Sequence, residues 1–222
     1  MAQQGGHRMG IYLNPNHTDF CNAVNHSQIY VDKTELIQYT NSVLFGEQKY
    51  ICVSRPRRFG KSMAANMLTA YYSRGCDSKE LFQELKIATH PDFEKHLNQY
   101  NVIHLNMRDY LTESENMKQL IQFVEDDLLD ELQQEFSDLR MPRRKTLVKV
   151  LEQAFAQYKI PFVFIIDEWD CIFRVHKSDA VSQKDYLDFL RNLLKDKSYI
   201  ALAYMTGILT IKKYGEHSAI NV

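Results

Sequence analysis

A lysine and a hydroxyl residue stand together where a basic turn meets a helical pattern. Gly60, Lys61 and Ser62 end a turn that begins after Val53. A lysine at the end of such a turn can reach β- and γ-phosphate oxygens, and the hydroxyl that follows can ligate Mg²⁺. Backbone N–H groups of the turn and of the helix N-terminus add to the same anion site. The predicted chemistry is binding of a nucleotide with its magnesium ion.

The flanking residues give this turn its context. The apolar run at 50–53 predicts a buried strand, and residues 61–74 repeat apolar side chains at helical spacing. A strand, a turn and a helix in this order are the setting that a phosphate-binding loop requires. We therefore expect seven consecutive residues to contact the nucleotide: Arg57, Arg58, Phe59, Gly60, Lys61, Ser62 and Met63.

One residue of the turn departs from the usual pattern of phosphate-binding loops. Arg55 occupies the place of the first glycine in GxxxxGK[ST], and Pro56 restricts the backbone next to it. The guanidinium groups of Arg55, Arg57 and Arg58 can compensate, because arginine binds phosphate well. Two alternatives stay open: an ordinary turn into a helix, and a basic surface for a partner.

An acidic pair follows the most apolar strand candidate. Residues 162–166 are five apolar β-formers in a row, which is typical of a central strand covered on both faces. Asp167 and Glu168 come directly after them, at the strand end that lines ligand crevices in α/β sheets. Asp167 suits the holding of Mg²⁺, and Glu168 suits activation of the attacking water. The alternative is a solvated acidic turn.

Four nearby residues have weaker signals. Thr206 ends a further apolar run at 199–205, where a hydroxyl can sense the γ-phosphate and orient the lytic water, or merely complete a turn. Asp170 is expected to form a surface ion pair with Arg174, and Trp169 is expected to pack in the core.

Strand patterns alternate with helical patterns along the chain, which predicts an α/β fold with a mostly parallel sheet and flanking helices. The expected strands are at 50–53, 101–107, 162–166 and 199–205, with short extended stretches at 11–14 and 29–31. The expected helices are at 32–44, 61–74, 78–85, 91–99, 113–136, 143–158 and 183–195. Asp32 and Glu35 have capping-box spacing, and Gly75 is the expected C-cap of the second helix.

Composition places the chain among cytoplasmic globular proteins. It has 222 residues, 45% hydrophobic and 25% charged, and a net charge of −1 draws it towards neither nucleic acid nor an anionic membrane. Its four cysteines have no zinc spacing and are expected to be reduced thiols. No apolar run is long enough to span a membrane. We expect a flexible leader at 1–10, with Met1 or Met9 as the natural start, and one domain at 11–222.

Four stretches of the sequence resemble the AAA-ATPase-like domain family, whose members are bacterial. The resemblance covers nearly all of the chain after Met9. The second stretch is specific enough that the missing first glycine is a trait of the family. The stretches are YVDKT at 30–34, SRPRRFGKS at 54–62, IDEWD at 166–170 and MTGIL at 205–209.

The resemblance implies a P-loop ATPase-like fold of the additional-strand type. Lys61 and Ser62 match its Walker A end, and Asp167 and Glu168 match its Walker B. Many members carry a C-terminal PD-(D/E)xK nuclease-like domain, which is absent from this sequence, and Thr210 stands where they often have proline. The family also has a further strand and a lid, so we expect a domain incomplete at its C-terminus. The strand at 50–53 is then an exposed edge unless the N-terminal segment or a partner covers it.

The leading functional hypothesis is Mg-dependent ATP binding and hydrolysis. One alternative, favoured by Arg55, is a nucleotide-responsive interaction module with little or no hydrolysis. Another is a nucleic-acid-associated factor that uses Arg55, Arg57 and Arg58, although the net charge near zero argues against it. A small-molecule kinase is less favoured, because the adjacent acids suit water activation. The expected partners are a nucleotide and either another protein or a second copy of the chain, without a membrane.

Overall fold

Four apolar segments form the strands of one parallel sheet. The computed structural model describes residues 10–209, and in this part of the chain the strands pair in the order β1-β4-β3-β2. β4 therefore lies between β1 and β3. All eight residues of β4 and all six of β3 are buried, as expected for central strands. The strands are β1 (Tyr50–Ser54), β2 (Asn101–Asn106), β3 (Phe162–Asp167) and β4 (Ile200–Gly207).

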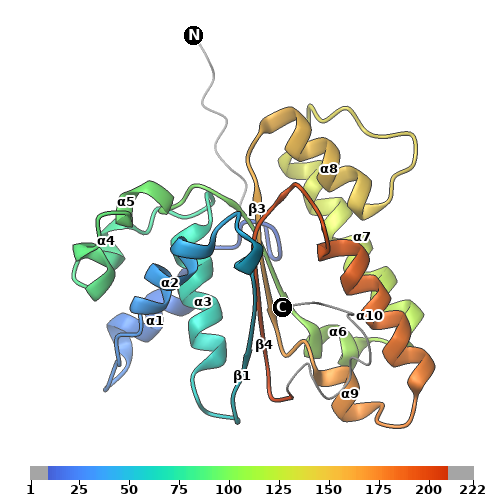
Figure 1. Ribbon diagram of the computed structural model, residues 1–222, viewed down its shortest axis with the longest axis horizontal. Coiled ribbons are helices and arrows are strands. Elements are labelled where there is room, and N and C mark those ends of the chain that lie inside the picture. The colour runs from blue at the N-terminus through green and yellow to red at the C-terminus, as the bar shows by residue number, and fades with distance from the viewer. Residues whose placement is uncertain (1–9, 210–222) are drawn as a thin grey trace.

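Helices cover both faces of this sheet, which confirms the predicted α/β architecture (Figure 1). The helices of the first half of the chain lie on one face, and those of the second half lie on the other. On the first face are α1 (Thr18–His26), α2 (Glu35–Val43), α3 (Lys61–Tyr72), α4 (Lys79–Phe82) and α5 (Phe93–His96), with 3-10 turns η1 (Glu47–Lys49) and η2 (Lys86–Thr89) in the same part of the chain. On the second face are α6 (Met107–Glu113), α7 (Met117–Glu135), α8 (Leu147–Tyr158), α9 (Cys171–Val175) and α10 (Ala180–Leu194).

The alternation of side chains along β3 divides the core into two. Val163 and Ile165 belong to the cluster that includes Leu68 of α3. Phe164 and Ile166 belong to the other cluster, with residues of α7, α8 and α10. Packing on both faces fixes β3 firmly, so its carboxyl end is a rigid place for functional side chains.

The N-terminal segment lies along β2, at the opposite edge of the sheet from β1. Leu13 forms an antiparallel bridge with Ile103, and one carboxylate holds the segment in place. Glu131 of α7 accepts hydrogen bonds from the N–H groups of Ile11 at 2.7 Å, Tyr12 at 3.0 Å and Leu13 at 2.6 Å. Within residues 10–209, β1 pairs with β4 alone, so this segment does not cover the β1 edge.

Several predicted element ends are wrong for local reasons. The helix expected at 113–136 begins only at Met117, because Asn116 accepts the Gln119 N–H at 3.0 Å and caps α7. A separate helix that was not predicted, α6, precedes it, and β2 ends at Asn106 rather than at residue 107. Asp32 does not form the expected capping box; its Oδ1 accepts from the Thr34 N–H at 2.8 Å, and α2 starts at Glu35. Residues 29–31 are not a strand.

Other predictions hold or fall outside the described residues. The α3 helix ends at Tyr72 with Ser73 as its C-cap, so Gly75 does not have that role. All four cysteines are free. Residues 1–9 of the expected leader lie outside the described part of the chain, as does Thr210.

Candidate functional site

In the loop between β1 and α3, the left-handed backbone positions differ from the one that the first glycine of GxxxxGK[ST] would suggest. Arg55 does not have a positive φ, and its N–H donates to the carbonyl of Gly207 at 3.1 Å, which ties the loop to the end of β4. The left-handed positions are instead Arg58, with a φ of 69°, and Gly60, with a φ of 76°. Because the backbone at Arg55 needs no positive φ, a glycine is not required there.

Lys61 opens α3 and turns its ammonium group back under this loop. Its Nζ donates to the carbonyl oxygens of Arg55 and Pro56, both at 3.0 Å, and the residue is only 8% exposed. Within residues 10–209 these neutral carbonyls are its hydrogen-bond partners, and no carboxylate forms an ion pair with it. A largely buried ammonium without an anionic partner is a strong binding group for an anion.

Asp167 is the point at which the two predicted motifs meet. Its Oδ2 accepts a hydrogen bond of 2.5 Å from the hydroxyl of Ser62, which is 105 positions away in the sequence. Its Oδ1 accepts from the hydroxyl of Thr206 and from the Glu168 N–H at 2.9 Å. The side chain is 5% exposed and is held from three directions. The carboxylate is therefore preorganised beside the start of α3.

Glu168 occupies a strained position just beyond β3. Its φ is 53°, an uncommon value for a residue with a side chain, and such strain concentrates at functional sites. Its carboxylate forms an ion pair with Arg174 of α9. The side chains of Glu168 and Arg174 are 19% and 18% exposed, so the pair is largely shielded from water.

Arg174 also approaches Asp170, at 3.4 Å. The predicted ion pair between these two residues is present, but its expected place on the surface is wrong, because Asp170 is 0% exposed. The Oδ2 of Asp170 accepts from the N–H groups of Ile208 at 2.8 Å and Leu209 at 2.6 Å. Trp169 is 1% exposed and packs on Phe173, which confirms its expected core role.

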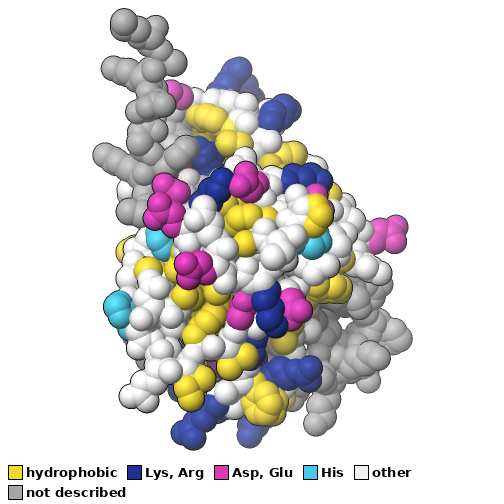
Figure 2. Space-filling view, turned by 90° about the vertical axis from the view of Figure 1, so that its left-hand side faces the viewer, with side chains coloured by type: hydrophobic (Ala, Val, Ile, Leu, Met, Phe, Trp, Pro, Cys, Tyr) yellow, Lys and Arg dark blue, Asp and Glu magenta, His cyan; other side chains and the backbone are white. Residues whose placement is uncertain are grey.

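A cavity of about 390 Å³ brings most of the predicted site residues together, and we call it the Lys61 pocket. It lies at the carboxyl end of the sheet, where an α/β fold places its ligands. Its lining residues are Arg57, Arg58, Gly60, Lys61, Ser62, Met63, Arg108 and Glu168. One group of Lys and Arg side chains gathers at the lower end of the molecule in Figure 2, the end at which Figure 1 shows the β1–α3 loop.

Three predicted residues do not line the Lys61 pocket. Phe59 is 61% exposed and points out of the loop. Asp167 lines an adjoining cavity of about 760 Å³, which it shares with Ser62 and His104. Burial lowers the pKa of His104, and the charges of nearby carboxylates oppose that shift. Thr206 is buried behind Asp167.

Sequence reasoning missed Arg108 and Lys33, and it paired Arg174 with Asp170 but not with Glu168. Arg108 lies two residues after the end of β2. Because the carboxyl ends of parallel strands meet at one edge, its place shortly after the apolar run at 101–105 was an available signal. Lys33 lies beside the loop, with its Nζ 3.5 Å from the carbonyl of Phe59. No local pattern indicated that contact, which depends on how the segment before α2 packs.

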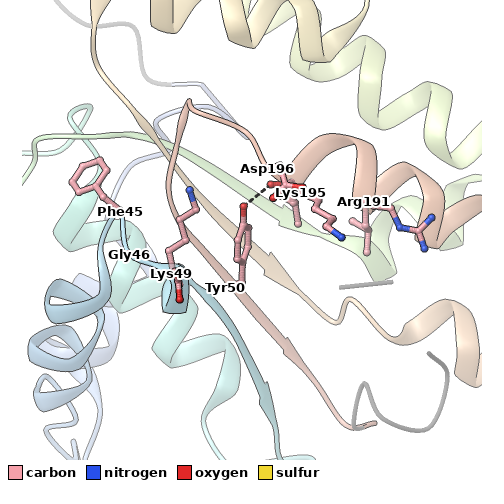
Figure 3. A pocket seen from close by; sticks show the side chains of 10 residues that line it. Phe45, Gly46, Lys49, Tyr50, Arg191, Lys195 and Asp196 are labelled. Carbon is pink, nitrogen blue, oxygen red and sulfur yellow. Dashed lines mark hydrogen bonds between the residues drawn. The ribbon is translucent and has the colours of Figure 1, made fainter. Parts of the chain in front are cut away.

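A third cavity, of about 480 Å³, lies at the amino ends of β1 and β4 (Figure 3). Phe45, Lys49 and Lys195 are among its lining residues, and the Tyr50 hydroxyl donates to the carbonyl of Leu194 at 2.9 Å. The predicted site residues all lie at the other end of these strands. This cavity is therefore separate from the Lys61 pocket.

Comparison with known proteins identifies one family. The model of the AAA-ATPase-like family, described as a predicted AAA-ATPase, matches residues 16–215. No curated protein matches the chain. Across residues 10–209, the helices are each too short or too polar to cross a membrane.

Proposed function

The chain belongs to the AAA-ATPase-like family, and from this membership and the geometry of its site we propose that it binds ATP with Mg²⁺ and hydrolyses it at the Lys61 pocket. One observation carries the proposal. The Ser62 hydroxyl and the Asp167 carboxylate, from two distant motifs, lie 2.5 Å apart, and Ser62 lines one pocket with Lys61. A nucleoside triphosphate with its metal needs this combination of a cation, a hydroxyl and a carboxylate.

The donor atoms at this point fit a magnesium ion. Ser62 and Asp167 offer hydroxyl and carboxylate oxygens, the hard ligands that Mg²⁺ prefers. Ser62 and Asp167 would hold the ion, and its positive charge would offset the negative charge of the phosphates.

Binding of the phosphates requires Lys61 to change partners. Its ammonium leaves the carbonyls of Arg55 and Pro56 and contacts β- and γ-phosphate oxygens. The N–H groups at the start of α3 point at the same anion, because the first turn of a helix leaves them unpaired. Arg57 and Arg58 add positive charge from the exposed rim of the pocket.

In the proposed hydrolysis, Glu168 is the general base that accepts the proton of the attacking water. As the water oxygen bonds to the terminal phosphorus, the bond to the departing ADP oxygen breaks and the Glu168 carboxylate accepts the water proton. Arg174 keeps that carboxylate in one orientation through their ion pair. Thr206 is then a positioning residue, because its hydroxyl holds Asp167.

Calorimetric titration with Mg·ATP tests the binding half of the proposal. We expect the wild type to bind and Lys61→Ala to lose most of its affinity, because the buried cation beneath the loop is gone. Lys118→Ala, an exposed lysine on α7, is the matched control and should bind like the wild type. Equal affinities of Lys61→Ala and wild type would contradict the proposal.

Phosphate release tests the hydrolytic half. Glu168→Gln should bind ATP but lower the turnover about 10²-fold to 10⁴-fold, which is the usual contribution of a general base. Retained turnover in this variant would remove Glu168 from the chemistry.

A second candidate is a module that binds ATP and responds to it with little hydrolysis. The observation that favours it is the ion pair of Glu168 with Arg174, because a carboxylate held in an ion pair is a weaker base for the attacking water. A wild type that binds Mg·ATP but releases phosphate no faster than Mg·ATP in buffer without protein would establish this second function. Use of the exposed arginines for nucleic acid, and assembly with another protein or a second copy, stay predictions.

A further inference from the structure

Arg108 is fixed at its backbone and unpaired at its side chain. It is the second residue of α6, and its N–H donates to the Oδ1 of Asn106 at 3.1 Å. Met107, beside it, is 0% exposed and anchors the start of the helix in the core. The Arg108 side chain is exposed and lines the Lys61 pocket. Over residues 10–209 its guanidinium has neither a hydrogen bond nor an ion pair, so it is available to a ligand.

The strand order gives this guanidinium a definite place along the site. From the loop that follows β1, the sheet runs through β4 and β3 to β2. Lys61 and Ser62 stand at the first end, Glu168 follows β3, and Arg108 follows β2. Neighbouring strands lie about 4.8 Å apart, a spacing that an arginine side chain can span. A phosphate chain that begins at the loop and ends beside Glu168 therefore presents its terminal phosphate to Arg108.

We propose that Arg108 binds the terminal phosphate of ATP and makes the Lys61 pocket prefer ATP over ADP. This inference rests on the proposed function and adds the residue that binds the third phosphate, which ADP lacks. A guanidinium suits the task, because its planar fork donates two parallel hydrogen bonds to phosphate oxygens and carries its charge at every physiological pH. Positive charge at this point also stabilises the terminal phosphate during hydrolysis.

Arg57 lines the same pocket from the other side and offers a matched comparison. It belongs to the loop that follows β1, so it lies close to phosphates that ATP and ADP share. Loss of Arg57 should weaken both nucleotides to a similar degree, whereas loss of Arg108 should weaken ATP alone. Arg140, an exposed residue after α7, is the control for removal of one positive charge.

The experiment is calorimetric titration of the full chain with Mg·ADP and with the Mg²⁺ complex of β,γ-imido ATP, which is not hydrolysed. For Arg108→Ala we expect the Kd of the ATP analogue to rise about 10-fold to 100-fold, the usual effect of losing charged hydrogen bonds. The Kd of ADP should stay the same. Arg108→Lys should recover part of the loss, and Arg140→Ala should match the wild type. The thermal unfolding midpoint of each variant checks folding, and Arg108→Ala should keep it because the side chain is exposed.

The outcomes separate this inference from the proposed function. A wild type that binds neither nucleotide overturns the proposed function itself. A wild type that binds both, with Arg108→Ala showing unchanged affinities or an equal loss for ADP and the analogue, overturns only the role of Arg108.

Discussion

The two turns that form the site are built in opposite ways. The loop from Arg55 to Gly60 is mostly exposed, with Arg57, Arg58 and Phe59 open to solvent. The turn after β3 is closed, because Trp169 and Asp170 are 1% and 0% exposed and Asp170 accepts two backbone N–H groups. Both turns contain left-handed backbone at residues with side chains. Both turns therefore have a strained backbone, but only the side chains of the open loop are free to change hydrogen-bond partners.

This difference separates ligand binding from stability. Side chains of the open loop contact little of the folded protein, so changing them should alter nucleotide affinity more than unfolding free energy. Trp169 and Asp170, the buried side chains of the closed turn, pack against or bond to the residues around them, so changing either should lower the unfolding free energy. Measured changes in unfolding free energy test this difference between the two turns.

The largest effect is expected from Asp170→Ala. The substitution leaves the N–H groups of Ile208 and Leu209 without their acceptor and removes a buried carboxylate next to Arg174. We expect the free energy of unfolding to fall by about 3 kcal/mol, in line with breaking a buried charged pair. Urea denaturation followed by circular dichroism measures it.

Asp185→Ala is the matched control, because that aspartate is exposed on α10. Its unfolding free energy should lie within about 0.5 kcal/mol of the wild type. Similar small losses for the Asp170 and Asp185 variants would show that the closed turn is no more important to stability than the surface.

The fold was predictable because each strand combines a strong apolar pattern with clear breaks. The run from Phe162 to Ile166 packs on both faces, and the sequence shows this without tertiary information. The strand patterns do not give the order of the strands, which the structure shows with β4 between β1 and β3. Helix ends were harder to predict. α7 begins only after Asn116, whose side chain accepts the Gln119 N–H, and a side-chain hydrogen bond of this kind competes with a continuous helix.

The sequence predicted which residues lie together when those residues follow a strand end in a known motif. Lys61, Ser62 and Glu168 line one pocket, and Asp167 accepts a hydrogen bond from Ser62, while their roles in binding and hydrolysis stay predictions. Arg174 could not be found from the sequence in its present role, because its pairing with Glu168 depends on the direction in which the short α9 helix leaves the turn. The sequence indicated that Asp170 would pair with Arg174, but it did not indicate that Asp170 would be completely buried.

An intermediate effect is expected from Gly60→Ala in the open loop. Gly60 has a φ of 76°, and an added Cβ would lie 3.2 Å from the Lys33 Nζ. A left-handed backbone costs an alanine about 1 kcal/mol or more, so we expect the unfolding free energy to fall by about 1 kcal/mol. Gly46→Ala is the control, since Gly46 has a φ of −75° and should change stability by less than about 0.5 kcal/mol. Equal losses at the two glycines would mean that the left-handed turn has no special cost.

The smallest change in stability, and the sharpest contrast with binding, is expected from Arg58→Gly. Arg58 is exposed and has a φ of 69°, so glycine relieves strain of about 1 kcal/mol but adds a similar entropy to the unfolded chain. The two terms offset each other, and the unfolding free energy should move by less than about 0.5 kcal/mol. Mg·ATP affinity should still fall several-fold, because a guanidinium leaves the Lys61 pocket. If Arg58→Gly keeps the wild-type affinity, the strained arginine serves something other than the nucleotide, and the open loop becomes the surface on which to seek a macromolecular partner.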